Sequence, residues 1–139
     1  MWRLWTVMTV FAFAGCAQIP PSPQDAEAKK FNSVPDKSVI YIVRGRVGPP
    51  LGETISLNDQ LQITTWTGTY YRWETEPGAH HIQGFAPSGA SIRLTTEPGK
   101  IYFVRHVVIG TWRDGVQNTF LEPMDEGTGR AFVKDAQLL

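Results

Sequence analysis

Three histidines, His80, His81 and His106, are the side chains of this sequence with the widest chemical repertoire. A histidine cluster becomes a metal site only when the imidazoles reach one ion, and zinc usually takes three or four protein ligands. His80 and His81 are adjacent in a strand-like segment, so their side chains point to opposite faces and cannot chelate one ion together. We therefore expect no metal site and no cofactor. His80 follows Pro77-Gly78 and is expected to cap that turn or pack structurally.

Nucleophilic and acid–base catalysis lack their usual sequence arrangements. The chain contains no Gly-x-Ser-x-Gly element, and Ser56, Ser88 and Ser91 have no histidine close in sequence. Glu74 and Glu76 share one face of a strand, which is more typical of an exposed polar face than of an acid–base pair. We expect no catalytic residue, although residues that meet only in the folded chain remain an alternative.

Aromatic and basic residues form a candidate binding face. Tyr70 and Arg72 alternate along one strand-like segment, and Trp112 and Arg113 stand in a stretch bounded by glycines. An exposed aromatic row flanked by arginines suits contact with glycan rings or with a partner protein. Aromatic residues in strands are also common core residues, and this alternative stays open. Because neighbouring strand residues point to opposite sides, Tyr70 and Tyr71 cannot both be buried in the same interior.

The composition is that of one small folded domain. The 139 residues are 42% apolar and 19% charged, with 13 glycines and 10 prolines, which is too apolar for a disordered protein and too turn-rich for a helical bundle. Thirteen basic residues balance thirteen acidic ones, so we expect no nucleic-acid partner bound through bulk charge. A single cysteine excludes an internal disulfide and a multi-cysteine metal site.

Residues 1–15 have the features of a secretory signal. Arg3 precedes an uncharged run, Leu4–Ala14, which is too short to span a bilayer because a helix needs about 20 residues for that. The end of the run, Phe13-Ala14-Gly15-Cys16, resembles the lipobox of bacterial lipoproteins, in which an apolar residue and two small ones precede the acylated cysteine. The resemblance implies a lipoprotein signal peptide at 1–15 and lipid attachment at Cys16.

Acylation has consequences for location. Each buried methylene contributes about 0.8 kcal/mol, and several chains on one cysteine make a stable anchor. In Gram-negative lipoproteins of the type resembled, an aspartate after the cysteine commonly retains the protein at the inner membrane, and here Ala17 stands there. The resemblance thus implies a lipid-anchored protein of the cell envelope, at the outer membrane and facing the periplasm. Two alternatives remain: cleavage after Ala12-Phe13-Ala14, which releases a soluble protein from Gly15, and an uncleaved helix with a free cysteine.

Residues 16–36 predict a flexible tether behind the lipidated cysteine. Four prolines interrupt helix and sheet there, and few large apolar residues are available for burial. The pattern allows a short helical turn at Asp25–Lys30, to which we assign no function.

Strand signals begin after Asp36. Ser38–Arg44 is an uninterrupted β-branched and aromatic run, typical of a strand buried on both faces. Asn58-Asp59 predicts a tight hairpin turn between two further strands. Thr75-Glu76-Pro77-Gly78 recurs as Thr96-Glu97-Pro98-Gly99, and Pro-Gly in each copy predicts a type II turn in a rhythm of hairpins.

These segments predict an all-β fold, a single antiparallel β-sandwich of immunoglobulin-like type. It would comprise about seven to eight strands within residues 37–124. Residues 125–139 form a C-terminal tail, expected to be a short helix or an edge strand.

The order of these elements resembles that of small bacterial lipoproteins with a single β-sandwich domain of unknown function. The matching segments are Ile40–Arg44, Asn58-Asp59, Thr67–Tyr71, Glu76–His80 and Glu97–Val104. Pro77–His80 also resembles the Pro-Gly-x-His element of PEGA-type sandwich modules of surface proteins. The resemblance covers residues 38–122 and implies a fold and a location, since this group has no settled activity.

Together these observations predict a non-catalytic envelope lipoprotein, a membrane-tethered sandwich that is a binding or structural module. Its expected partners are the membrane, through the lipid, and an envelope protein or peptidoglycan. A glycan- or peptidoglycan-binding module that uses an exposed aromatic face is one alternative. A small hydrolase with a site not visible in the sequence is another.

Overall fold

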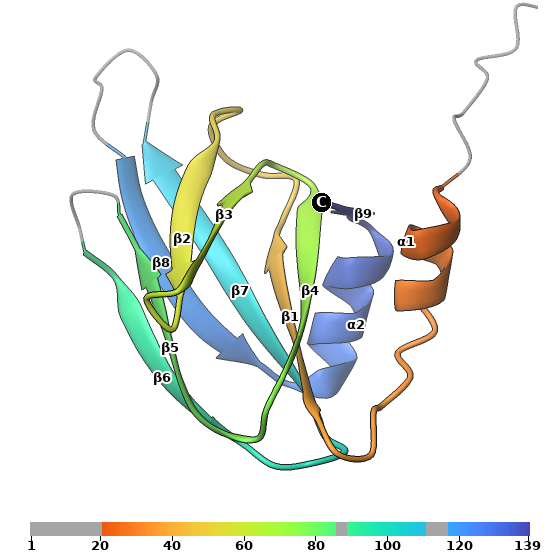
Figure 1. Cartoon of the computed structure of the whole chain (residues 1–139). Coiled ribbons are helices and arrows are strands. Elements are labelled where there is room, and N and C mark those ends of the chain that lie inside the picture. Colours follow the sequence, from red (N-terminus) through yellow and green to blue (C-terminus); the bar gives the residue numbers. More distant parts are fainter. Residues whose placement is uncertain (1–20, 86–88, 111–116) are drawn as a thin grey trace, which may run out of the picture.

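The computed structural model describes residues 21–85, 89–110 and 117–139, which form nine strands and two helices (Figure 1). In chain order these are α1 (Pro23–Ala28), β1 (Ser38–Arg44), β2 (Glu53–Leu57), β3 (Leu61–Thr65), β4 (Thr69–Thr75), β5 (Gly78–Gly84), β6 (Ser91–Thr96), β7 (Ile101–Gly110), β8 (Gln117–Met124), α2 (Glu126–Lys134) and β9 (Gln137–Leu138).

The strands form two sheets, which confirms the predicted all-β sandwich (Figure 1). The larger sheet has the order β8-β7-β1-β4-β9, and the smaller one has the order β3-β2-β5-β6. The pairing differs in one respect from the antiparallel arrangement expected throughout, because β1 pairs with β7 and β4 with β9 in parallel. Parallel neighbours need a long connection, and between β1 and β7 the chain passes through five other strands.

β1 lies at the centre of the larger sheet and is buried along its whole length, as its apolar run predicted. Ile40 and Ile42 point into the interior between the two sheets. Tyr41 points to the opposite face, where it packs with Phe31, just after α1, and with Val133 of α2. The two helices therefore add a third layer on the outer face of the larger sheet, and one apolar cluster lies on each side of that sheet (Figure 1).

The turns were predicted with mixed success. The hairpin at Asn58-Asp59 is confirmed: both residues have positive φ, 53° and 56°, and they join β2 to β3. The two Thr-Glu-Pro-Gly segments are not hairpins, because each carries the chain from one sheet to the other. Gly99, with φ 73°, has the conformation of a type II turn, and the Lys100 N–H donates to Glu97 O at 3.4 Å. Gly78, with φ 135°, lies outside that turn type.

The prediction of a flexible tether is wrong for residues 22–31. α1 and the residues after it dock on the larger sheet and bury Asp25, Ala28 and Phe31. Ala28 and Phe31 are spaced so that both reach the same apolar cluster, which a count of large apolar residues along the segment did not detect. Residues 17–20 lie outside the described part of the chain.

The C-terminal residues form both of the elements that were expected as alternatives. α2 begins at an Asp125 cap whose carboxylate accepts from the Thr128 N–H at 2.9 Å, and β9 pairs with the start of β4. Gly129 lies where α2 crosses β7, and a Cβ there would stand 2.2 Å from Phe103. A glycine is therefore needed for the helix to approach the sheet this closely.

Candidate functional site

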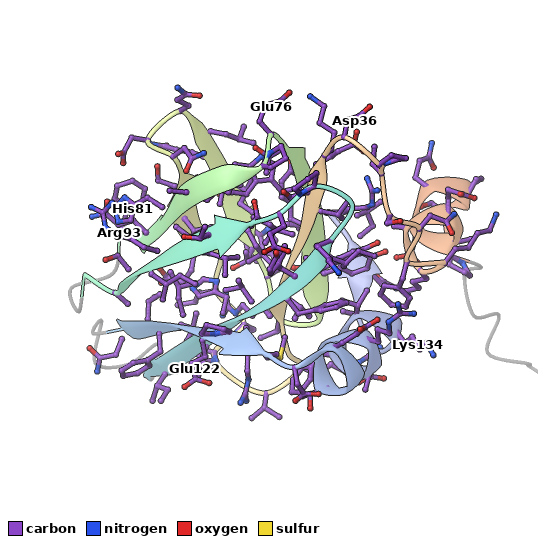
Figure 2. All side chains as sticks on the ribbon, turned by 90° about the horizontal axis from the view of Figure 1, so that it is seen from below. Asp36, Glu76, His81, Arg93, Glu122 and Lys134 are labelled. Carbon is purple, nitrogen blue, oxygen red and sulfur yellow. The ribbon has the colours of Figure 1, made fainter. Side chains whose placement is uncertain are left out.

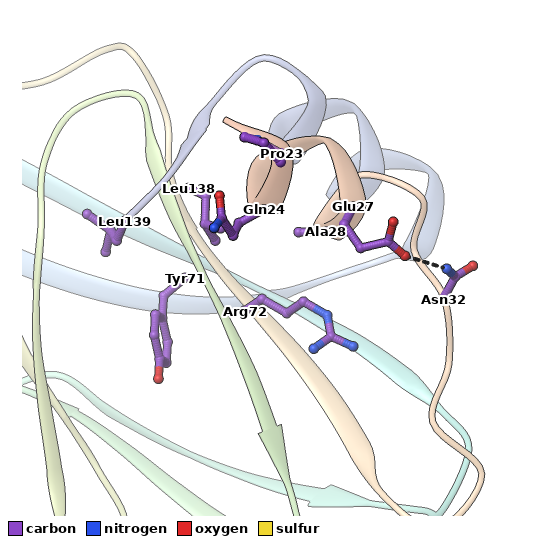
Figure 3. A pocket seen from close by; sticks show the side chains of 9 residues that line it. All are labelled: Pro23, Gln24, Glu27, Ala28, Asn32, Tyr71, Arg72, Leu138 and Leu139. Carbon is purple, nitrogen blue, oxygen red and sulfur yellow. Dashed lines mark hydrogen bonds between the residues drawn. The ribbon is translucent and has the colours of Figure 1, made fainter. Parts of the chain in front are cut away.

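A groove of about 590 Å³ lies between α1, β4 and the C-terminal residues (Figure 3). Its lining combines apolar and amide side chains with one cation and one anion: Pro23, Gln24, Glu27, Ala28, Asn32, Tyr71, Arg72, Leu138 and Leu139. The groove thus offers an apolar floor with charged groups at its side.

β4 presents an unpaired backbone edge to this groove. β9 pairs with only the first two residues of β4, and no other described strand lies on that side of it. The Leu139 N–H donates to Tyr70 O at 2.9 Å, so the backbone groups of Tyr70 face β9. Because backbone groups alternate along a strand, those of Arg72 and Glu74 face the same side. β4 can therefore pair with an added strand where β9 ends.

α1 forms the opposite wall of the groove, and its start is encoded locally. Ser22 caps the helix by accepting from the Asp25 N–H at 3.1 Å, and Pro23 occupies the first turn. A helix of 6 residues is not stable alone in water, so contact with the sheet must stabilise it.

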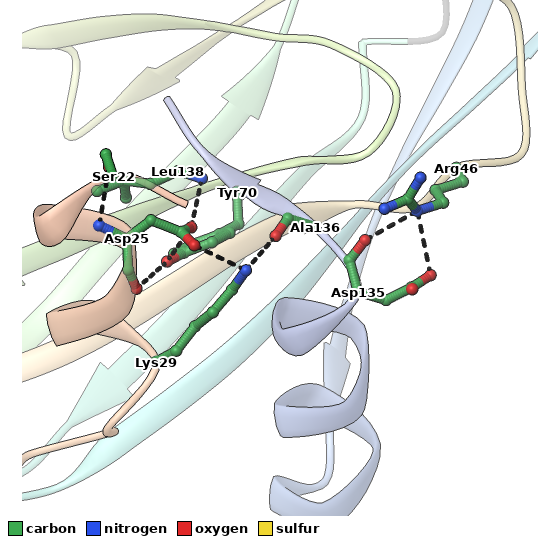
Figure 4. Close-up of polar contacts among 8 residues, drawn as sticks. All are labelled: Ser22, Asp25, Lys29, Arg46, Tyr70, Asp135, Ala136 and Leu138. Carbon is green, nitrogen blue, oxygen red and sulfur yellow. Dashed lines mark hydrogen bonds and ion pairs between the residues drawn. The ribbon is translucent and has the colours of Figure 1, made fainter. Parts of the chain in front are cut away.

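Asp25, which the sequence analysis did not single out, fastens α1 to the sheet and to the C-terminus (Figure 4). Its carboxylate is buried and accepts from the Tyr70 hydroxyl at 3.0 Å and from the Leu138 N–H at 2.9 Å. Lys29 lies 2.9 Å from the same carboxylate and donates to Ala136 O at 2.6 Å. Burial alone would raise the pKa of Asp25, but the hydrogen bonds from Lys29, Leu138 and Tyr70 outweigh it and lower the pKa. The capping pattern Ser22-x-x-Asp25 was the signal available in the sequence.

The prediction that Tyr70 belongs to an exposed binding face is wrong, because its side chain is fully buried. The strand alternation was correct, since Tyr70 and Tyr71 lie on opposite faces of the larger sheet. The outward-facing Tyr70 is buried because α1 covers it. Arg72 does line the groove, and its Nη1 lies 3.1 Å from Glu74 Oε2.

The other three predicted site residues are not among the residues that the structure describes. Trp112 and Arg113, the rest of the candidate binding face, and Cys16, the candidate lipid-attachment residue, lie outside the described residues.

His80 caps the Pro-Gly turn, as expected. Its Nε2 donates to Glu76 O at 2.8 Å, and its Nδ1 accepts from the Asn58 side-chain amide at 2.9 Å. The ring is buried edge-on against Trp73, with a centroid separation of 5.0 Å, and burial lowers the pKa of His80. His80 is thus a structural residue that joins two turns.

Arg44 and His106 are buried polar residues that both bond to Thr65, an arrangement that the sequence analysis did not predict. The Arg44 guanidinium donates to three carbonyl groups, Pro49 O at 2.6 Å, Leu51 O at 2.7 Å and Thr65 O at 3.1 Å, and so holds the β1–β2 loop to the end of β3. Burial lowers the pKa of Arg44, which Glu53 partly opposes. His106 shares a hydrogen bond of 2.9 Å with the Thr65 hydroxyl. Both residues support the fold at the end of the sandwich.

No protein-family model matches this chain, and no curated protein is significantly similar to it. Within residues 21–85, 89–110 and 117–139, no helix is long and apolar enough to cross a membrane. Across the same residues, no three side chains of the histidine, cysteine and acidic types come together as metal ligands would.

Proposed function

We propose that this chain is a non-catalytic, lipid-anchored module of the bacterial cell envelope that binds an extended segment of an envelope protein in the groove beside β4. The observation that carries the proposal is the unpaired edge of β4 next to an apolar groove. An extended peptide that adds a strand gains main-chain hydrogen bonds from such an edge and side-chain contacts from the adjoining pocket.

The charges of the groove suit binding. Glu27 pairs with Lys30, and Arg72 pairs with Glu74, so each charged group already has a partner. The Glu74 hydrogen bond raises the pKa of Arg72 against the opposing effect of burial, so the guanidinium stays charged. With one cation and one anion beside an apolar floor, both already paired, the groove favours a bound segment of apolar and uncharged polar residues.

The lipid anchor is supported by the lipobox-like Phe13–Cys16. The location at the outer membrane, facing the periplasm, is supported by Ala17, which stands where an aspartate would favour the inner membrane. The burial of Tyr70 favours a peptide over a glycan as ligand, because it removes an aromatic residue from the stacking face that a glycan would need.

A photo-crosslinking experiment in intact cells tests the groove. Gln24 and Ala26 are both exposed on α1, but only Gln24 lines the groove. A benzophenone amino acid at position 24 is expected to give a discrete protein adduct, and the same amino acid at position 26 is the matched control. Adding Leu139→Asp, a charge on an exposed groove residue, is expected to abolish the adduct.

Identical adducts at both positions, or none at either, would contradict the proposal. A high-mass adduct at position 24 that muramidase digestion removes would instead establish the glycan alternative.

A further inference from the structure

Exposed apolar side chains gather at one end of the sandwich. Among the described residues, eight large hydrophobic side chains are exposed. Six of them lie where β1, β3, β5 and β7 end, or at the C-terminus, and we call these six the apolar rim: Val47, Leu51, Trp66, Phe85, Ile109 and Leu139. Val47 is 94% exposed and Trp66 49%. Scattered exposed apolar residues are ordinary, but a cluster at one end indicates a contact surface.

Strand pairing places these residues at the same end. The end of β1 lies opposite the start of β4 and beside β7, which runs in the same direction. Arg44, the last residue of β1, donates to Thr65 O at the end of β3, which joins the corresponding ends of the two sheets. The β1–β2 loop carries Val47 and Leu51, and Trp66 follows β3 directly.

The opposite end has a different character. It carries charged residues, of which Asp36 and Glu76 are exposed and Lys37 pairs with Glu76 (Figure 2, seen from that end). At the rim end, Arg46 forms an ion pair with Asp135 at 3.3 Å. Glu53 interacts electrostatically with the guanidinium of the buried Arg44. The sandwich is therefore amphipathic from end to end.

α1, the first described element, begins at the rim end. Asp25 of α1 accepts from the Leu138 N–H, so the start of the helix lies beside the C-terminus (Figures 1 and 4). Only residues 17–21 separate Cys16 from the cap Ser22. Six residue steps span at most about 21 Å when fully extended. An acyl chain on Cys16 would thus hold this end of the sandwich close to the bilayer.

We propose that the apolar rim rests on the surface of the lipid bilayer to which Cys16 is anchored, with Trp66 at the level of the headgroups. The inference rests on the lipid anchor of the proposed function. Tryptophan prefers the membrane interface, and apolar side chains there gain free energy in proportion to the area they bury. A short covalent tether raises the effective concentration of the surface, so weak contacts of a few side chains suffice.

Fluorescence quenching by brominated lipids tests this contact in the full lipidated protein. After signal removal the tryptophans are Trp66, Trp73 and Trp112, so Trp73→Phe with Trp112→Phe leaves Trp66 as the reporter. In vesicles of phosphatidylcholine and phosphatidylglycerol, brominated acyl chains are expected to quench its emission about twofold or more. If Trp73→Phe disturbs folding, the difference between the wild type and Trp66→Phe gives the same quantity.

The matched control moves the reporter to the other end. Glu97 lies in the turn between β6 and β7, at the opposite end of the sandwich, and is exposed. Glu97→Trp with all three native tryptophans changed to phenylalanine is expected to show no quenching. Vesicle-bound protein with an unquenched Trp66, or with equal quenching of both reporters, would overturn the inference and leave the anchor intact. Protein that does not sediment with the vesicles would overturn the anchor and this inference together.

Discussion

His106 makes the stability of this domain sensitive to mild acid. Its ring is 1% exposed, and its Nε2 has no hydrogen-bond partner in the described structure. Burial, helped by the nearby charge of Arg44, lowers the pKa of His106 to about 4. The folded protein therefore keeps the imidazole neutral at a pH where the unfolded chain protonates it.

The expected consequence is a loss of stability between pH 6.5 and pH 4. In this range the unfolded state binds the proton and the folded state does not, so the free energy of unfolding falls as the pH falls and levels off below about 4. The loss should be on the order of 3 kcal/mol. His106→Asn should flatten this part of the profile, and His81→Asn should not. Denaturant unfolding of the three proteins across the range measures it, and an unchanged slope in His106→Asn would contradict the assignment.

At the scale of elements, α1 and the residues after it are part of the fold. Phe31 is 6% exposed and packs on Tyr41 and Phe103, with ring centroids 5.4 and 6.0 Å away. Its backbone has a positive φ of 55°, which turns the chain from the helix toward β1. Residues 22–31 are therefore held against the body of the domain.

Phe31→Ala is expected to destabilise the domain by about 3–5 kcal/mol, because it leaves a cavity in the cluster beneath the helices. Phe85, which is 56% exposed, supplies the matched control. Phe85→Ala should change stability by no more than about 0.5 kcal/mol. Chemical denaturation compares the two variants, and equal, small effects would show that α1 is not packed as described.

Elements with local signals were predictable, and contacts between distant segments were not. β1 was recognised from its unbroken apolar run, and the β2–β3 hairpin from Asn58-Asp59. The Pro-Gly turns were located, but nothing local distinguishes a hairpin from a crossing between sheets. The same holds for the candidate site. Strand alternation selected Arg72, which does line the groove, whereas the burial of Tyr70 depends on a contact with Asp25, 45 positions earlier in the chain.

For the whole molecule, the docking of α1 changes the expected geometry at the membrane. A tether over residues 16–36 would let the sandwich move freely above the bilayer. With α1 packed on the sheet, only residues 17–21 would separate the proposed anchor from the fold, and the apolar rim and the part of the groove formed by Leu138 and Leu139 lie at the end where the anchor would enter. A partner bound in the groove would then be held next to the membrane.

The central claim is that the chain is anchored through Cys16, and the mass of the intact mature protein extracted from membranes tests it most directly. We predict a chain that begins at Cys16 and carries the added mass of its acyl groups, and a Cys16→Ser protein that is absent from the membrane fraction. An unmodified mature chain that begins at Gly15 would contradict the claim and establish ordinary secretion.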